Sequence, residues 1–364
     1  MQAPRLRVAV IPGDDAAPEA VLASLEVLRA LQLPVEWVVL PDGEVLSRQM
    51  SPQEMEELVR RTVDSCHTAL FGATSGKTRG IGYLRWGKET YANVRPVRWR
   101  PGYRSPLRHP QGIDYVIVRE NLEDLYLGVE GELTALAQGA PELLAPRYRP
   151  GYSYLGQEGR FALKVVSRSQ TERVAHFACR LALARQARGH PGKVTVGSKH
   201  NVLPRSDGFF RQVVAEVVAQ YPGLAYQELL ADDLARRLVA SPQELDVVLL
   251  PNLYGDLLSD VAAGTIGGLG LAPSGCYGDS YAYFEPVHGT APDIAGRHII
   301  NPTATLLSAA MMLEHLGLTE AAARLEAAVA AVYAAGGPLT PDQGGTASTE
   351  EFCQAVIARL EGGG

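Results

Sequence analysis

Residues 245–260 read Leu-Asp-Val-Val-Leu-Leu-Pro-Asn-Leu-Tyr-Gly-Asp-Leu-Leu-Ser-Asp. The first part of this stretch is short and almost wholly apolar, which is typical of a buried β-strand. The second part places Asp256 and Asp260 four residues apart, so that on a helix both carboxylates project from one face. Paired carboxylates behind a strand suit a hard divalent cation such as Mg²⁺ or Mn²⁺. A solvated helix face is the alternative for such a pair taken alone.

Strands and helices alternate on both sides of this stretch, which predicts the α/β class. The expected strands are residues 7–12, 69–72, 115–118 and 193–196. One expected helix ends near residue 31, and two others begin at capping boxes at Ser51 and Ser169. Two further helices are expected at about residues 302–316 and 319–335. Residues 127–160 are rich in Gly, Pro and Tyr and have weak periodicity, so we interpret them as an arm or insertion.

The composition limits the class of protein and the partners that it can have. A chain of 364 residues with 46% hydrophobic residues can build a sizeable core, and a net charge of −6 argues against nucleic acid. The four cysteines are scattered without a C-x-x-C pair, so neither a zinc cluster nor a disulfide framework is expected. With neither a signal peptide nor a long apolar stretch in the sequence, we expect a cytoplasmic protein that makes no use of a membrane.

Two glycine-containing segments invite a nucleotide-binding interpretation. Residues 72–78, Gly-Ala-Thr-Ser-Gly-Lys-Thr, have three residues between the glycines where a phosphate-binding P-loop has four. Residues 13–18, Gly-Asp-Asp-Ala-Ala-Pro, lack the G-x-G-x-x-G pattern of a Rossmann turn. A nucleotide-phosphate-binding protein is therefore a disfavoured alternative.

Three arginines follow or end apolar segments, where a side chain can point into a cleft. They are Arg85, Arg95 and Arg119. Converging guanidinium groups would clamp a di- or tricarboxylate, whereas three unrelated surface arginines are the alternative. Lys199 follows a predicted strand and could act as a general base if its pKa were lowered, although a lone lysine is usually solvated.

Four runs together carry a family resemblance: residues 91–96, 118–121, 252–260 and 288–296. They resemble the β-decarboxylating hydroxyacid dehydrogenases, which act on isocitrate, homoisocitrate, 3-isopropylmalate or tartrate/malate, and are most similar to the homoisocitrate/isocitrate branch. The resemblance implies a two-domain isopropylmalate-dehydrogenase-like fold with a shared central sheet, not a Rossmann fold. It assigns residues 1–95 and 267–364 to a cofactor-binding domain and 96–266 to a dimerisation, metal and substrate domain with an arm at about 127–160. It also implies a homodimer, or a tetramer, with active sites shared between subunits.

The resemblance also implies roles for single residues. Tyr126, Lys199 and Asp232 would be catalytic, and Asp232, Asp256 and Asp260 would bind Mg²⁺ or Mn²⁺, with Lys199 and Asp232 reaching the site from the neighbouring subunit. The expected substrate-binding residues are Arg85, Arg95, Arg119, Ser75 and Arg79. The expected cofactor-binding residues are Asn201, Glu285, His288, Gly289, Asp293, Ile294 and Asn301. Asp293 can accept hydrogen bonds from both ribose hydroxyls of NAD and would repel a 2′-phosphate, so NAD is the predicted dinucleotide.

The segment before Arg85 faces the C3 substituent of the substrate in this family. Here it offers Ser75, Lys77, Thr78 and Arg79, with only Ile81 apolar, which favours an anionic tail. The expected reaction is oxidative decarboxylation of an isocitrate- or homoisocitrate-like 2-hydroxy-3-carboxy acid. The alternatives are a phosphonate analogue of isocitrate, 3-isopropylmalate or malate, and, in another class, a non-catalytic regulatory subunit.

Two departures from the family pattern affect backbone geometry. The usual Gly-Asp-Gly-Ile-Gly loop here begins Gly13-Asp-Asp-Ala-Ala, which makes a turn with positive φ less easy. The Arg-Glu-Asn motif, usually followed by Thr-Glu-Gly, continues here as Leu122-Glu-Asp124. Because the expected metal and arginine positions are all kept, we predict an active enzyme.

Overall fold

A continuous mixed sheet of ten strands runs through the computed structural model, which describes residues 5–362. In spatial order the strands are β2 (Val35–Val39), β1 (Leu6–Ile11), β3 (Thr68–Phe71), β12 (Ala282–Pro286), β11 (Pro273–Tyr277), β4 (Ala92–Arg98), β5 (Asp114–Glu120), β10 (Val247–Leu250), β8 (Lys193–Ser198) and β9 (Ala225–Leu230). The two pairings of β11 and the pairing of β4 with β5 are antiparallel, and the other pairs are parallel.

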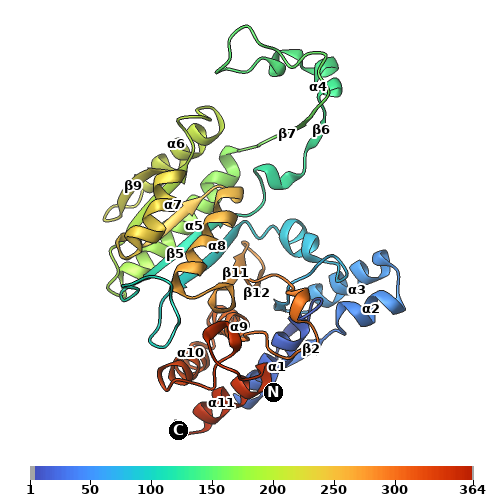
Figure 1. Cartoon of the computed structure of the whole chain (residues 1–364), viewed down its shortest axis with the longest axis vertical. Coiled ribbons are helices and arrows are strands. Elements are labelled where there is room, and N and C mark those ends of the chain that lie inside the picture. Colours follow the sequence, from blue (N-terminus) through green and yellow to red (C-terminus); the bar gives the residue numbers. More distant parts are fainter. Residues whose placement is uncertain (1–4, 363–364) are drawn as a thin grey trace.

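The two sides of the sheet come from different parts of the chain. Residues 6–98 and 273–286 supply the six strands from β2 to β4, and residues 114–250 supply the other four. The two sets lie in the lower and upper parts of the body in Figure 1. Division into the domains 1–95 with 267–364 and 96–266 stays a prediction, and β4 crosses the first of its boundaries.

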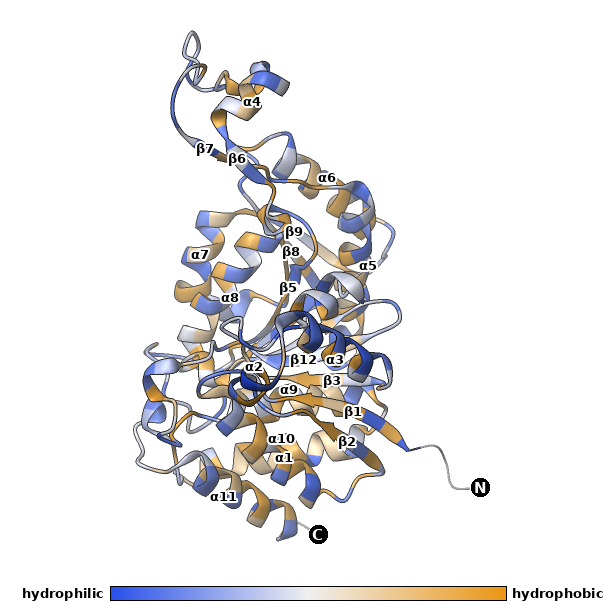
Figure 2. Cartoon of the chain, turned by 90° about the vertical axis from the view of Figure 1, so that its right-hand side faces the viewer, coloured by the Kyte–Doolittle hydropathy of each residue, from blue (hydrophilic) through white to orange (hydrophobic). Residues whose placement is uncertain are grey.

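Helices cover both faces of the sheet (Figure 1). They are α1 (Ala17–Ala30), α2 (Gly43–Gln49), α3 (Pro52–Asp64), α5 (Arg168–Gln186), α6 (Ser206–Val218), α7 (Ala231–Ala240), α8 (Asn252–Ile266), α9 (Thr303–His315), α10 (Thr319–Ala334) and α11 (Thr349–Glu361). Every residue of β3 and β10 is buried, as expected for parallel strands covered on both faces. The hydrophobic residues accordingly gather on the strands and on the inner sides of the helices (Figure 2).

Helix starts follow local capping chemistry. Ser51 and Glu54 form the predicted capping box of α3, with both reciprocal hydrogen bonds present. The capping box predicted at Ser169 is wrong, because α5 begins two residues earlier and the Ser167 side chain accepts from Gln170 N. Ser167 Oγ also lies 2.5 Å from Glu123 Oε1, so contact with a distant segment selects this serine as the cap.

An arm leaves the body near residue 128 and returns near residue 163 (Figures 1 and 2). It contains β6 (Glu130–Glu132), α4 (Leu133–Gly139) and β7 (Arg160–Ala162), and β6 pairs with β7. Leu143, Tyr148 and Leu155 are at least 60% exposed on it, which leaves apolar surface without cover from the same chain. Within residues 5–362, the structure contains no helix with the length and apolar character needed to cross a bilayer.

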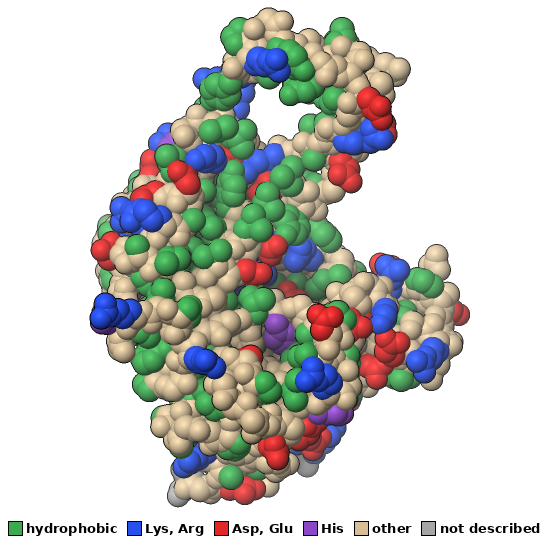
Figure 3. Space-filling view, in the orientation of Figure 1, with side chains coloured by type: hydrophobic (Ala, Val, Ile, Leu, Met, Phe, Trp, Pro, Cys, Tyr) green, Lys and Arg blue, Asp and Glu red, His purple; other side chains and the backbone are tan. Residues whose placement is uncertain are grey.

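The parallel strands β5, β10 and β8 end at one edge of the sheet. The segments that follow them carry Tyr126, the start of α8 and Lys199. Ligands of open α/β sheets bind beyond the carboxyl ends of parallel strands. The space-filling view is hollowed on the side between this edge and the part of the molecule that carries α2 and α3 (Figure 3).

Candidate active site

Two carboxylates of α8 face two arginines of the central strands. Arg95 on β4 lies 3.4 Å from one oxygen of Asp256 and 3.4 Å from one oxygen of Asp260. Arg119 on β5 forms an ion pair with the same Asp256 oxygen. Burial works against ionisation of Asp256, but Arg119 and a hydrogen bond from Tyr126 hold its pKa below the ordinary value. The pKa of Asp260 is raised by burial, which Arg95 only partly offsets.

Arg85 lies in a π-helical turn at Tyr83–Gly87. Its guanidinium carbon lies 5.8 Å from the centre of the Tyr126 ring, and that of Arg119 lies 4.6 Å from the same ring. The Tyr126 hydroxyl donates to Asp256. The structure therefore brings the expected arginines together around one tyrosine and one aspartate, although they come from three separate segments.

Two buried donors of this cluster have no hydrogen-bond partner within the part of the chain that the structure describes. They are Nε of Arg85 and Nη2 of Arg119. A buried guanidinium N–H without an acceptor is costly. The cluster thus offers a place for an anion, and planar forked donors suit a carboxylate.

Sequence reasoning missed the residues that orient these arginines. Asn252 Oδ1 accepts from Arg119 Nε at 2.8 Å, and Ser259 Oγ accepts from Arg95 Nη1 at 2.6 Å. Gly255 leaves room for Arg119, because a Cβ there would lie 2.6 Å from Arg119 Cγ. Asn252 and Ser259 are buried on α8, four residues before and three residues after Asp256, so all three side chains lie on one helix face. This spacing is the sequence signal from which both residues could have been predicted.

Tyr126 combines a protonated phenol with a fixed direction. Burial and the hydrogen bond to Asp256 raise the pKa of its hydroxyl. Asp124 begins the short helix Leu125–Leu127 that carries the ring. A phenol held neutral next to an arginine cluster can donate a proton to a reacting atom.

Lys199 and Asp232 form an ion pair with each other and not with the carboxylates of α8. Lys199 follows β8, Asp232 is in the first turn of α7, and their charged atoms are 2.5 Å apart. The hydrogen bond from Lys199 lowers the pKa of Asp232. Across residues 5–362, no three Asp, Glu, His or Cys side chains gather closely enough to hold a metal ion. A single chain therefore does not assemble the predicted set of Asp232, Asp256 and Asp260.

Four of the expected cofactor residues line a mainly apolar cavity of about 370 Å³. They are His288, Gly289, Ile294 and Asn301. His288 Nε2 is buried and, in the described chain, has no hydrogen-bond partner, while Nδ1 lies 2.9 Å from Gly289 O. Burial lowers the pKa of His288, which favours a neutral imidazole. The cavity suits an aromatic base with polar edges.

Three other expected cofactor residues lie outside that cavity lining. Asp293 is exposed in the short helix Pro292–Ile294, directly before Ile294 of the cavity lining. Glu285 is half-buried on β12, and burial raises its pKa against the opposing effect of Arg85. Asn201 is exposed after Lys199, and its carbonyl accepts from Tyr148 of the arm at 3.1 Å.

The side-chain amide of Asn301 is already occupied. Its Nδ2 donates to Asp342 at 2.9 Å and to Tyr333 at 3.2 Å, and its Oδ1 accepts from Thr303 N at 3.0 Å.

The segment expected to face the substrate tail wraps around Asp14 instead. The carboxylate of Asp14 accepts from the hydroxyls of Thr74 and Thr78 at 2.7 and 2.6 Å, and from backbone amides of residues 75, 77 and 78. Burial opposes ionisation of Asp14, but the hydrogen bonds from Thr78 and Thr74 lower its pKa. This protein carboxylate fills the cradle that a phosphate would need, which rules against the P-loop interpretation.

The expectation that Thr78 lines the tail pocket is corrected by these contacts, whereas that for Lys77 stays a prediction. Thr78 is buried against Asp14, and Lys77 pairs with Asp15 at 2.9 Å and with Glu44. Asp15 has a φ of 54°, so the altered first loop does require the left-handed conformation that glycine adopts easily. Ser75 and Arg79 are exposed, and within residues 5–362 the Arg79 guanidinium forms no ion pair.

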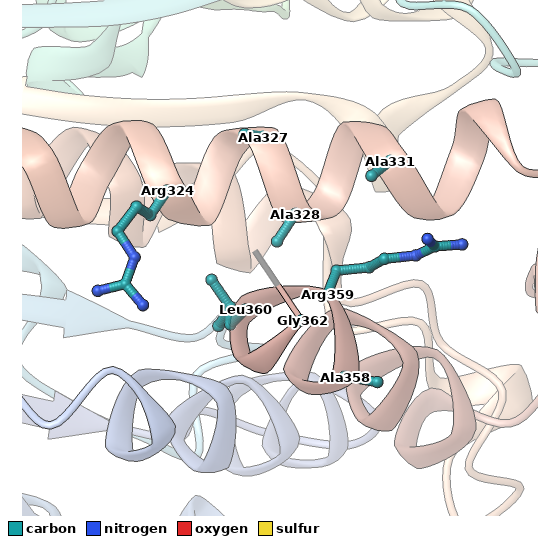
Figure 4. A pocket seen from close by; sticks show the side chains of 8 residues that line it. All are labelled: Arg324, Ala327, Ala328, Ala331, Ala358, Arg359, Leu360 and Gly362. Carbon is teal, nitrogen blue, oxygen red and sulfur yellow. The ribbon is translucent and has the colours of Figure 1, made fainter. Parts of the chain in front are cut away.

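A second cavity of about 370 Å³ lies between α10 and α11 (Figure 4). Half of its lining residues are alanine, and Arg324 and Arg359 extend in opposite directions along its rim (Figure 4). It contains none of the residues expected in the active site.

Comparisons with known proteins address the family to which this chain is similar. The family model described as isocitrate/isopropylmalate dehydrogenase matches residues 7–356. The chain is 42% identical over 363 residues to an isocitrate/homoisocitrate dehydrogenase of Thermus thermophilus, covering 98% of each chain. It is 41% identical over 357 residues to a 3-isopropylmalate/3-methylmalate dehydrogenase of Methanocaldococcus jannaschii, covering 97% of this chain and 98% of the relative.

A solved structure extends the agreement to the fold. The isocitrate dehydrogenase of Methylococcus capsulatus superposes with a TM-score of 0.81 at 31% identity, covering 98% of this chain and 99% of the other. The predicted resemblance, the α/β fold and the prediction of a dehydrogenase are confirmed by these matches. The chain belongs to the isocitrate/isopropylmalate dehydrogenase family.

Proposed function

We propose that this protein catalyses NAD- and divalent-metal-dependent oxidative decarboxylation of a 2-hydroxy-3-carboxy acid with an anionic C3 substituent. The products are a 2-oxo acid and CO₂. The observation that carries the proposal is the cluster of Arg85, Arg95 and Arg119 around Tyr126 and Asp256, in which two buried donors have no acceptor among residues 5–362. In this cluster the arginines bind and orient the carboxylates of the substrate.

The donor set fits Mg²⁺ or Mn²⁺. Asp256 and Asp260 offer only carboxylate oxygens on one helix face, and hard cations prefer such ligands. Asp232 of a second copy supplies the third carboxylate, because one chain does not bring the three together. When bound, the cation supplies Lewis-acid stabilisation of negative charge on the substrate oxygens.

The apolar cavity beside His288 fits the adenine end of a dinucleotide. His288 Nε2 is a buried polar atom without a partner in the described chain, and the exposed Asp293, next to Ile294 of the lining, can accept from ribose hydroxyls. The same carboxylate disfavours a 2′-phosphate by charge repulsion, which supports NAD over NADP. When bound, NAD supplies the hydride acceptor.

Proton transfers fall to Lys199 and Tyr126. Lys199 acts as the general base in its neutral amine form: it takes the hydroxyl proton of the substrate and becomes an ammonium that pairs with Asp232. Tyr126, whose raised pKa keeps the phenol protonated, returns a proton to the carbon of the enol that remains after CO₂ leaves. The arginines hold the carboxylates in place through both steps.

The tail of the substrate is proposed to be an anion. Arg79 is exposed and, in the described part of the chain, its guanidinium has no acidic partner, so it is available to a carboxylate together with Ser75. An isocitrate- or homoisocitrate-like acid is the first candidate. A phosphonate analogue of isocitrate, 3-isopropylmalate and malate remain as alternatives for the same chemistry.

The active site is proposed to form in a homodimer, with a tetramer as the alternative. Val239 on α7 and Leu257 and Val261 on α8 are 43–58% exposed apolar residues on neighbouring helices. Covering them with a second copy would bury apolar surface next to Lys199 and Asp232. A non-catalytic regulatory subunit is disfavoured, because the side chains proposed for proton transfer and metal binding are all present.

The test is NADH formation by the purified protein with Mg²⁺ or Mn²⁺ and a panel of hydroxy acids. The panel comprises isocitrate, homoisocitrate, 3-isopropylmalate, malate, tartrate and a phosphonate analogue of isocitrate, with NADP⁺ in parallel. Turnover with NAD⁺ and an acid that carries an anionic tail is expected. Preference for 3-isopropylmalate would overturn the anionic tail, and metal binding by a folded protein without turnover would favour the regulatory subunit.

A further inference from the structure

A buried ion-pair network lies beside the candidate active site, among residues that have no role in the reaction proposed above. Lys164 Nζ is 2.8 Å from Asp207 Oδ1 and 3.4 Å from Asp124 Oδ1. The Lys164 side chain is 13% exposed, that of Asp124 2% and that of Asp207 0%. Nζ also lies 4.4 Å from the centre of the Tyr254 ring on α8. Charges this deeply buried are tolerated only when they are well paired, so their further contacts are informative.

One acid of the network joins two elements of the site. Asp124 Oδ1 accepts from Leu125 N at 2.9 Å, which begins the short helix that carries Tyr126. Asp124 Oδ2 accepts from Leu253 N at 3.0 Å, in the first turn of α8 and three residues before Asp256. A single carboxylate therefore fixes the Tyr126 segment against the start of the helix that carries the proposed metal ligands.

The other acid holds the loop of the proposed general base. Asp207 Oδ2 accepts from the backbone N of Lys199 at 2.7 Å. Asp207 lies in the first turn of α6, where the helix dipole favours a negative charge. Lys164 links the two acids, and it follows β7 at the base of the arm.

We propose that Lys164 is a positioning residue for the reaction. By pairing with Asp124 and Asp207 it holds the Tyr126 segment, the first turn of α8 and the Lys199 loop in one fixed arrangement, without touching the substrate. This inference rests on the proposed function for the roles of Tyr126 and Lys199. Because Tyr126 serves the site of its own chain and Lys199 that of the second copy, the network also joins the two active sites of a dimer.

The kinetic test compares Lys164→Met, Lys164→Arg and the control Lys193→Met in the full-length protein. Lys193 lies at the opposite end of β8 from the Lys199 loop. We expect Lys164→Met to lower kcat about 10-fold or more, because displaced catalytic groups react slowly, while KM changes little. Lys164→Arg should restore most of kcat, and Lys193→Met should match the unaltered protein. Equal kcat for Lys164→Met and the unaltered protein would overturn the inference and leave the proposed function intact.

A second measurement does not depend on turnover. Backbone hydrogen–deuterium exchange in residues 121–128 and 199–207 should be faster in Lys164→Met, whereas exchange in α9 and α10 should stay the same. Unchanged exchange in either segment, or a uniform rise across the protein, would refute a positioning role. If the unaltered protein turned over no acid of the panel, the proposed function would fail and the exchange measurement alone would decide on the network.

Discussion

Asp124 has a backbone conformation that an aspartate rarely adopts. Its φ of 68° and ψ of −147° lie near a region that is almost exclusive to glycine. Replacement by Gly or Ala removes the same carboxylate contacts, but only Gly relieves the strain. We therefore predict that Asp124→Ala unfolds with a free energy about 1–2 kcal/mol lower than Asp124→Gly. Urea unfolding of the two variants measures the difference, and equal stability would show that no strain is stored at this position.

Asp293 is the residue on which the proposed preference for NAD rests. A carboxylate that accepts from the ribose hydroxyls contributes a charge-assisted hydrogen bond, so Asp293→Ala should raise the KM for NAD⁺ about 10-fold with little change in kcat. The same substitution should lower the KM for NADP⁺, because it removes a repulsive charge. Steady-state kinetics with both cofactors check this, with Glu320→Ala, on the exposed start of α10, as the control. An unchanged KM for NAD⁺ would remove Asp293 from the cofactor site.

At the scale of elements, α5 offers a matched pair of serines. Ser167 caps the helix and contacts Glu123, whereas Ser169 lies inside the first turn. Ser167→Ala should lower the free energy of unfolding by about 1–2 kcal/mol, and Ser169→Ala should change it by less than about 0.5 kcal/mol. Thermal or urea unfolding measures both, and a larger loss for Ser169→Ala would contradict the assigned cap.

The end of β5 carries a carboxyl that titrates near neutrality. Burial raises the pKa of Glu120 to about 7, although Leu122 N and Glu123 N donate to it. Because the folded pKa is above the unfolded one, Glu120 stabilises the fold below its ordinary pKa, and this contribution is lost as pH rises through about 7. Glu120→Gln should therefore gain stability relative to the unaltered protein between pH 5 and 8, by at most about 3 kcal/mol.

Unfolding of Glu120→Gln at several pH values measures that gain, with the exposed Glu320→Gln as the control. A stability difference that stays constant with pH would show that Glu120 is ionised in the folded protein across the whole range.

Local patterns predicted many of the elements. β1, β3, β10, α9 and α10 lie within about two residues of their predicted bounds, because burial patterns and turn residues are short-range signals. The antiparallel insertion of β11 between β12 and β4 was not predicted. It depends on pairing residues near 92–94 with residues near 275–277, and the sequence pattern does not encode such distant partners.

The candidate site shows the same division between local and distant signals. The spacing of Asp256 and Asp260 predicted their common helix face, and the resemblance supplied Tyr126 and the arginines. The cradle around Asp14 and the pairing of Lys164 with Asp207 join segments more than forty residues apart. Such polar residues pair with each other only where the fold buries them, and otherwise they face solvent. Because burial is known only from the folded chain, these contacts could not be predicted from the sequence.

At the scale of the whole molecule, the sheet separates the groups that the proposed reaction must combine. Tyr126, Asp256 and Asp260 follow β5 and β10, whereas Lys199 and Asp232 pair with each other after β8 and β9. A second copy that covers α7 and α8 would bring its own Lys199 and Asp232 to the first set. The exposed apolar residues of those helices and of the arm are the surface that such an assembly would bury.

Shared sites make a prediction that single-chain sites do not. Asp256→Asn and Lys199→Met should each be inactive as pure proteins, because each removes one half of every site. Refolding them together forms mixed dimers in which one site has both defects and the other has none. Recovery of up to about a quarter of the unaltered activity is expected, since half of the dimers are mixed and each has one intact site. Sites built within one chain would recover nothing, so NADH formation by the co-refolded mixture, against the two proteins refolded separately, decides between the two architectures.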